Sequence, residues 1–162
     1  MRRLASSLFV LPLFLSSAIA ADLVPWGTAG SWDVMIDPTL GNGCLIQSEF
    51  DDGSLVRIGF DRTTDSGYLM AFNMAWGDIA GGQAYPVAFA LDGEMYEGQA
   101  VGIWLNDVPG ADIAFDNTDF LFDIAKRYTM TLFHDGQEVM AIDLKGSGAA
   151  LEAAIRCQDE QG

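Results

Sequence analysis

The sequence predicts an all-β protein: an antiparallel β-sandwich of about eight strands built from hairpins, with two short helices. Three observations support this class. Asp-Gly pairs separate β-rich runs at three places, apolar residues alternate with polar ones in several of these runs, and half of all residues are hydrophobic. Alternation with a period of two places one face of a strand against a core. The sequence therefore predicts strands that bury one face each.

The strongest local signal is the three Asp-Gly turns at Asp52-Gly53, Asp92-Gly93 and Asp135-Gly136. Asp-Gly adopts the positive φ that a tight hairpin turn demands. Each turn separates two runs that we expect to pair as antiparallel strands. The runs are Cys44–Phe50 with Ser54–Phe60, Val87–Leu91 with Glu94–Leu105, and Tyr128–His134 with Gln137–Leu144.

Two further strands complete the expected sheet, Trp32–Asp37 and Tyr68–Met74, the latter after a polar loop from Asp61 to Gly67. Alternation also predicts which side chains face the core. We expect Tyr68, Met70, Phe72 and Met74 to share one apolar face, and likewise Val101, Ile103 and Leu105. Core filling is the default interpretation of such a methionine-containing stripe.

Two helices are predicted after the middle strands and at the C-terminal end. Asn117, Thr118 and Asp119 offer capping side chains ahead of a stripe of apolar residues. Ser147 is predicted to cap the second helix in the same way. The apolar stripes are Phe120, Leu121 and Ile124 in the first helix, and Leu151, Ala154 and Ile155 in the second.

Residues 1–20 have the pattern of a secretory signal peptide. Arg2 and Arg3 form a basic start, an apolar run follows, and Ala18-Ile19-Ala20 is a small-x-small cleavage site. Cleavage would leave residues 21–162 as a single β-sandwich domain, in the periplasm or secreted and without a membrane anchor. The size suits one domain with its own core.

The charge balance restricts the classes of partner. Eight Lys and Arg residues face 23 Asp and Glu residues, for a net charge of −15 at pH 7. Nucleic acids and anionic membranes require a basic surface, so both are excluded as expected partners. The acidity is interpreted mainly as an aid to solubility or as a sign of a salt-rich habitat, and a cationic partner is the sharper alternative.

The chain has two cysteines, Cys44 and Cys157. An exported protein with two cysteines usually pairs them, so a disulfide between an early strand and the C-terminal helix is predicted. Two buried free thiols are the alternative. A metal site built on them is disfavoured because the chain has one His and no Cys-x-x-Cys spacing.

No catalytic residue, cofactor or metal ligand is predicted. His134 precedes a hairpin turn, where we expect a solvated side chain with no pocket around it and no necessary function. Acidic groups at Asp61 and Asp65, and at Asp112, Asp116 and Asp119, raise calcium as a hypothesis. Neither group matches the spacing of an EF-hand loop, and turn chemistry accounts for the same residues.

Two tryptophans flanked by glycine, Trp26 and Trp76, are read as loop residues and form the candidate binding surface for an unknown protein or glycan partner. The alternative for each is a tryptophan that covers a sheet edge. The resulting hypothesis is a binding or interaction module without catalysis. A periplasmic hydrolase that uses Asp or Glu carboxylates is the alternative from another class.

Three segments resemble the exported bacterial family named after invasion-associated locus B. They are Trp32-Asp33-Val34 with Cys44-Leu45-Ile46, Phe120-Leu121 with Lys126 and Tyr128–Phe133, and Ile142–Gly146 with Ala149-Ala150-Leu151. Ser147 stands where the family has an aromatic residue, and Cys157 departs from the family pattern. The resemblance implies an antiparallel β fold in the periplasm and no established enzymatic chemistry.

Overall fold

A computed structural model describes residues 22–162, so the predicted signal peptide and its cleavage site lie outside the described residues. Ten strands and two α-helices make up this part of the chain. They are β1 (Val24–Ala29), β2 (Trp32–Asp37), β3 (Gly43–Glu49), β4 (Leu55–Asp61), β5 (Ser66–Phe72), β6 (Ala84–Leu91), β7 (Glu94–Leu105), β8 (Val108–Phe115), α1 (Asp119–Ala125), β9 (Thr129–His134), β10 (Gln137–Asp143) and α2 (Ser147–Glu160), with a 3-10 turn at Pro38–Leu40 after β2.

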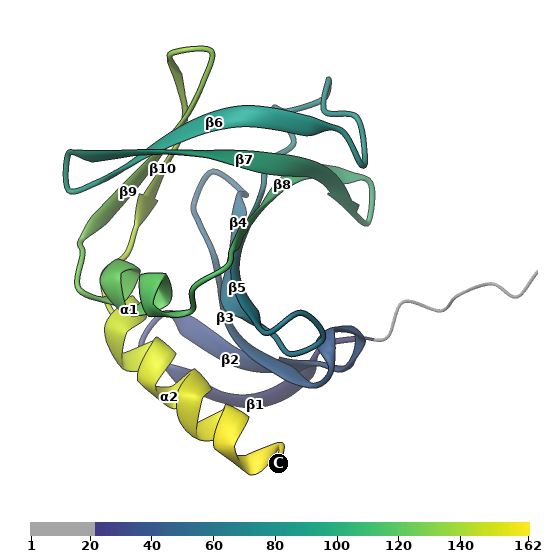
Figure 1. Ribbon diagram of the computed structural model, residues 1–162, viewed down its shortest axis with the longest axis vertical. Helices are drawn as coiled ribbons and strands as arrows, with labels where there is room; N and C mark the ends of the chain where they lie inside the picture. Colours follow the sequence, from purple (N-terminus) through teal and green to yellow (C-terminus); the bar gives the residue numbers. More distant parts are fainter. Residues whose placement is uncertain (1–21) are drawn as a thin grey trace, which may run out of the picture.

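The predicted all-β class is confirmed, with ten strands in place of about eight. The strands form one sheet in the order β1-β2-β3-β4-β5-β8-β7-β6-β9-β10, and all its neighbours are antiparallel. The sheet curves strongly, so that strands from its two halves contribute to one core (Figure 1). These two halves are the facing layers of the expected sandwich.

The hairpin signals identified real turns. In the second and third hairpins both turn residues have positive φ: 48° and 89° at Asp92-Gly93, and 49° and 73° at Asp135-Gly136. In the first, only Gly53 has a positive φ, of 78°, and Asp52 instead accepts a hydrogen bond from the backbone N–H of Ser54 at 2.9 Å. All three Asp-Gly predictions are confirmed.

Two strands, β1 and β8, were not predicted from the sequence. In β1 the pairing register with β2 shifts between Pro25 and Gly27, so Trp26 is the extra residue of a bulge. In β8, Pro109 and Gly110 argue against a strand. The turn before β8 uses Asn106 and Asp107, with φ of 47° and 68°, and contains no glycine.

The predicted inward face was wrong for β5 and β7. From β5 the core contains Leu69 and Ala71, and from β7 it contains Ala100. Neighbouring residues in a strand alternate between the two sides of the sheet, so both predicted stripes lie on the side opposite the core. These stripes are Tyr68, Met70 and Phe72 in β5, and Val101, Ile103 and Leu105 in β7. Met74 lies beyond β5 and is exposed. We call this side the second face.

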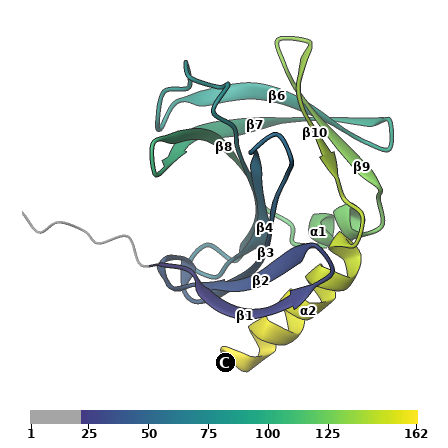
Figure 2. The same ribbon diagram turned by 180° about the vertical axis from the view of Figure 1, so that it is seen from behind.

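Both helices lie on the core side of the sheet (Figures 1 and 2). Of the capping candidates of α1, Thr118 occupies the cap position without a side-chain bond, and Asn117, one residue earlier, accepts from the backbone N–H of Asp119 at 2.8 Å. The cap predicted for α2 is wrong: Gly146 occupies the cap position with φ of 83°, and Ser147 is the first helical residue, with its hydroxyl buried and unpaired. No helix among residues 22–162 is long and apolar enough to cross a membrane.

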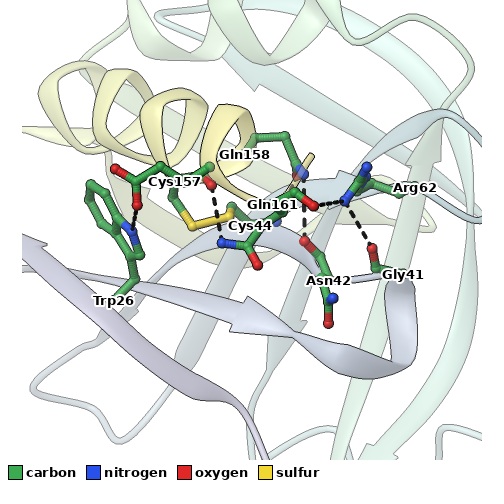
Figure 3. Close-up of a disulfide and its surroundings, with 9 residues drawn as sticks. Trp26, Gly41, Asn42, Cys44, Arg62, Cys157, Gln158 and Gln161 are labelled. Carbon is green, nitrogen blue, oxygen red and sulfur yellow. Dashed lines mark hydrogen bonds between the residues drawn. A yellow bond between two sulfur atoms is a disulfide. The ribbon is translucent and has the colours of Figure 1, made fainter.

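The predicted disulfide between Cys44 and Cys157 is confirmed, and it ties α2 to β3 across 113 residues of sequence. The two Cα atoms are 6.1 Å apart, inside the range that a disulfide spans. Neighbouring hydrogen bonds fix the same helix end (Figure 3). The side chain of Gln158 accepts from the backbone N–H of Cys44 at 2.9 Å, and Trp26 Nε1 donates to Glu160 at 2.8 Å.

Candidate functional site

The principal candidate site is an apolar cavity of about 230 Å³ between the loop that joins β5 to β6 and the core side of the sheet. Its wall combines this loop with strands from the second half of the sheet. The lining residues are Ala75, Trp76, Asp78, Ile79, Tyr85, Val87, Ala100, Ala111, Ile113, Leu132, Phe133, His134 and Val139. We call it the Trp76 pocket. A mostly apolar hollow with a few polar groups is typical of ligand sites.

The loop that carries Trp76 is held in place by its own hydrogen bonds. The side chain of Asn73 accepts from the backbone N–H of Ala75 at 2.8 Å, and the backbone N–H of Trp76 donates to the carbonyl of Asn73 at 3.0 Å. Further along, the backbone N–H of Ala80 donates to the hydroxyl of Tyr85 at 2.8 Å. The loop therefore presents Trp76 from a fixed backbone.

Small residues on β7 and β8 make room for the loop and the cavity. Gly102 exchanges hydrogen bonds with the loop, accepting from Gly82 and donating to Gln83, each at 2.8 Å. A β-carbon at position 102 would lie 2.2 Å from the carbonyl oxygen of Ala80, so only glycine permits this approach. Ala100 and Ala111 line the pocket nearby, where larger side chains would fill it.

The two tryptophans of the predicted binding surface lie in different places. Trp76 is in a loop, as expected, and it is half-buried against the core and lines the pocket. Trp26 was expected in a loop but lies in β1, where its indole is engaged by Glu160 of α2. It also borders a second, shallower hollow with Asp33 and Met35. The structure thus places the two tryptophans at two separate hollows rather than on one surface.

His134 does not stand free in solvent, so that expectation was wrong. Its side chain is 38% exposed and lines the Trp76 pocket. Nδ1 lies 3.0 Å from the carbonyl oxygen of Pro86, and because a carbonyl only accepts, Nδ1 carries the proton. The ring packs edge-on against Tyr85 at 5.7 Å, and Nε2 lies 3.5 Å from a carboxylate oxygen of Asp135. Hairpin position alone gave no sign of this packing.

The second face carries a polar group that the sequence reading missed. Arg57 on β4, Met70 on β5 and Asp112 on β8 are neighbours across three strands. The guanidinium of Arg57 lies 5.8 Å from the ring centre of Phe72, and its Nε donates to Gln47 at 2.9 Å. Among the described residues, no carboxylate lies within ion-pair distance of Arg57.

Burial dominates the ionisation of this group. It raises the pKa of Asp112 to about 6, with a smaller contribution from the charge of Asp61, and it raises the pKa of Tyr68. One carboxylate oxygen of Asp112 and the hydroxyl of Tyr68 are buried with no hydrogen-bond partner within the described part of the chain. A carboxyl with a raised pKa can act as an acid or base near neutral pH. The raised pKa of Asp112 could not be predicted from the sequence, because Asp112 lies in β8, which was not among the predicted strands.

The acidic groups considered for calcium do not form a metal cluster. Within residues 22–162 no set of three or more His, Cys, Asp or Glu side chains is placed to hold a metal ion. Asp61 instead accepts from the backbone N–H of Thr63 at 2.8 Å, which is turn chemistry.

Comparison with known proteins supports the fold alone. The sequence matches no protein-family model and no curated protein. The crystal structure of invasion associated protein B from Bartonella henselae is similar, with a TM-score of 0.57 and 14% sequence identity, and the match covers 82% of this chain and 96% of that chain. The expected resemblance is thus confirmed at the level of the fold: the chain has a fold similar to that of invasion associated protein B.

Proposed function

We propose that this protein is an exported binding module that takes up the apolar part of a ligand in the Trp76 pocket, without catalysis. The main observation in support of this proposal is the cavity of about 230 Å³ between the β5–β6 loop and the sheet. Burial of an apolar group is favourable by roughly 25 cal/mol per Å² of apolar area. A pocket of this kind therefore supplies affinity, and its few polar groups supply orientation.

The surroundings of the pocket fit a site that receives a partner. Met74 and Val139, next to or within the lining, are exposed apolar side chains. Val139 is the extra residue where the β9–β10 register shifts between Glu138 and Met140. Exposed apolar side chains around a hollow are a common feature of interaction sites. They support a ligand larger than the pocket itself, such as an apolar group presented by a protein or glycan.

The disulfide supports a location in an oxidising compartment. The disulfide between Cys44 and Cys157 is of the kind that persists in exported proteins. Together with the signal pattern of residues 1–20, it supports action in the periplasm or outside the cell.

The test uses NMR of the mature protein with 3,3-dimethylbutan-1-ol, a small neutral molecule with a branched apolar group. We expect saturable shifts of the Trp76 indole N–H and of lining amides such as Ala111 and Ile113. Trp76→Ala should abolish the saturable shifts. Trp26→Ala is the matched control, since Trp26 lies in β1 and outside the pocket lining. Saturable shifts that are equal in both variants would contradict the proposal.

A hydrolase is the second candidate, and Asp112 is the observation that favours it. Its half-buried carboxyl, with a pKa raised to about 6 by burial, lies on the same face as Arg57. Ester, peptide and glycoside substrates assayed with wild type and Asp112→Asn would test it, with the exposed Asp116→Asn as control. Turnover lost in Asp112→Asn alone would replace the binding module with an enzyme.

A further inference from the structure

We propose that the Trp76 pocket recognises an alkylated ammonium group, such as a trimethylammonium, on its ligand. This inference rests on the proposed function, because it specifies the chemistry of the ligand that the same pocket holds. Two aromatic residues, Trp76 and Tyr85, line the cavity together with Asp78. Aromatic faces attract a cation electrostatically, and the attraction is strongest with tryptophan.

The charges around the pocket have one sign. Asp78 is a lining residue, and Asp135 and Glu138 directly adjoin the lining residues His134 and Val139 in sequence. No Lys or Arg occurs among the described lining residues. The chain as a whole carries a net charge of −15, so its long-range field also attracts cations. An anionic ligand would meet repulsion at every one of these carboxylates.

The apolar wall selects among cations. A primary ammonium has three N–H donors that must all be satisfied when it leaves water. The lining offers few side-chain acceptors for three donors, because Nδ1 of His134 donates to Pro86 and the hydroxyl of Tyr85 already accepts from Ala80. Asp78 and Nε2 of His134 remain as acceptors, in a wall that is otherwise mostly apolar. An alkylated ammonium has the same charge but presents methyl groups instead of donors. Its surface matches apolar lining residues such as Val87, Ile113 and Leu132.

The test compares three small probes by the NMR titration described above. Choline carries a trimethylammonium, 3,3-dimethylbutan-1-ol is its uncharged isostere, and ethanolamine has the charge without the methyl groups. Cation–aromatic attraction predicts that choline binds about five- to thirtyfold more tightly than the alcohol. Ethanolamine should bind more weakly than choline by at least a similar factor.

Variants separate the contribution of charge from that of shape. Asp78→Asn should weaken choline binding while leaving the affinity for the alcohol unchanged. Trp76→Leu keeps an apolar side chain but removes the aromatic face, so it should reduce the preference for choline over the alcohol. Asp116→Asn removes an exposed carboxylate outside the lining and should change neither affinity by more than about twofold.

Each outcome bears on one of the two proposals. Equal affinity for choline and the alcohol, or binding of the alcohol alone, would overturn the cation inference and leave the binding pocket intact. Ethanolamine bound as tightly as choline would overturn the preference for an alkylated group. Failure of both choline and the alcohol to bind would overturn the proposed function itself.

Discussion

The backbone of Gly102 lies directly against the carbonyl of Ala80, which leaves no space for a β-carbon between strand β7 and the β5–β6 loop. The contact connects the stability of the sheet to the shape of the Trp76 pocket. Ile79, the residue before Ala80 in this loop, lines the pocket. The backbone N–H of Ala80 donates a hydrogen bond to the hydroxyl of Tyr85, another lining residue. A change at one glycine should therefore affect both folding and binding.

Gly102→Ala should lower the free energy of unfolding by about 1–3 kcal/mol, as overpacking against backbone generally does. It should also weaken binding of 3,3-dimethylbutan-1-ol, because the loop must move. Gly98→Ala in the same strand is the matched control, since its new β-carbon would meet its nearest neighbour at 3.8 Å, an ordinary contact. Urea denaturation and the NMR titration give the two readouts. Equal stability of the two variants would contradict the close approach.

Replacing both cysteines, Cys44→Ser with Cys157→Ser, should lower the free energy of unfolding by about 2–5 kcal/mol. The loop closed by the disulfide spans 113 residues, and long loops lose the most entropy when they are cross-linked in the unfolded chain. Urea denaturation of the variant and of the oxidised wild type measures the difference. As a covalent check, thiol labelling of denatured, unreduced wild type should detect no free sulfhydryl.

Asp112 should make the protein less stable as the pH rises from about 4 to about 6. Its folded pKa of about 6 is above the ordinary value of 3.8, so in this window the folded state binds more protons than the unfolded state. Above pH 6 the loss is complete and constant. Asp112→Asn should remove this slope, so its stability relative to wild type should increase by about 2 kcal/mol between pH 4 and pH 7. Asp116→Asn should show no such increase.

His134→Gln should lower the free energy of unfolding by about 1 kcal/mol or less. The substitution removes the hydrogen bond from Nδ1 to Pro86, and a neutral hydrogen bond contributes about this amount. A glutamine amide can donate to the same carbonyl, which limits the loss. The proposed binding site needs no general base, but His134 lines the pocket, so affinity for the alcohol should fall modestly through the lost ring contact. A much larger loss of function with an intact fold would favour the hydrolase.

Export should remove residues 1–20. Protein recovered from the periplasm or the medium is expected to begin at Ala21, after the Ala18-Ile19-Ala20 site. N-terminal sequencing or intact mass measures this directly. A product that keeps Arg2 and Arg3 and stays with the membrane would show that the signal-peptide reading is wrong.

The antiparallel β class, the three Asp-Gly hairpins and the pairing of Cys44 with Cys157 were all predictable from the sequence. These features follow from local rules. A turn that needs positive φ selects Asp-Gly over a few residues, and an exported chain with two cysteines has one intramolecular pairing. The turn at Asn106-Asp107 uses the same backbone geometry without glycine, which is why β8 was missed.

In β5 and β7, the face that points to the core could be identified only from the folded protein. In β5, Leu69 and Ala71 face the core while Tyr68 and Phe72 are buried on the second face, so hydrophobicity alone does not distinguish the two sides. The Trp76 pocket depends on the same long-range packing. It brings the β5–β6 loop against the small residues of β7 and β8, and places His134 beside Tyr85. Period and turn chemistry describe neighbours along the chain, whereas a cavity depends on contacts between strands that are distant in sequence.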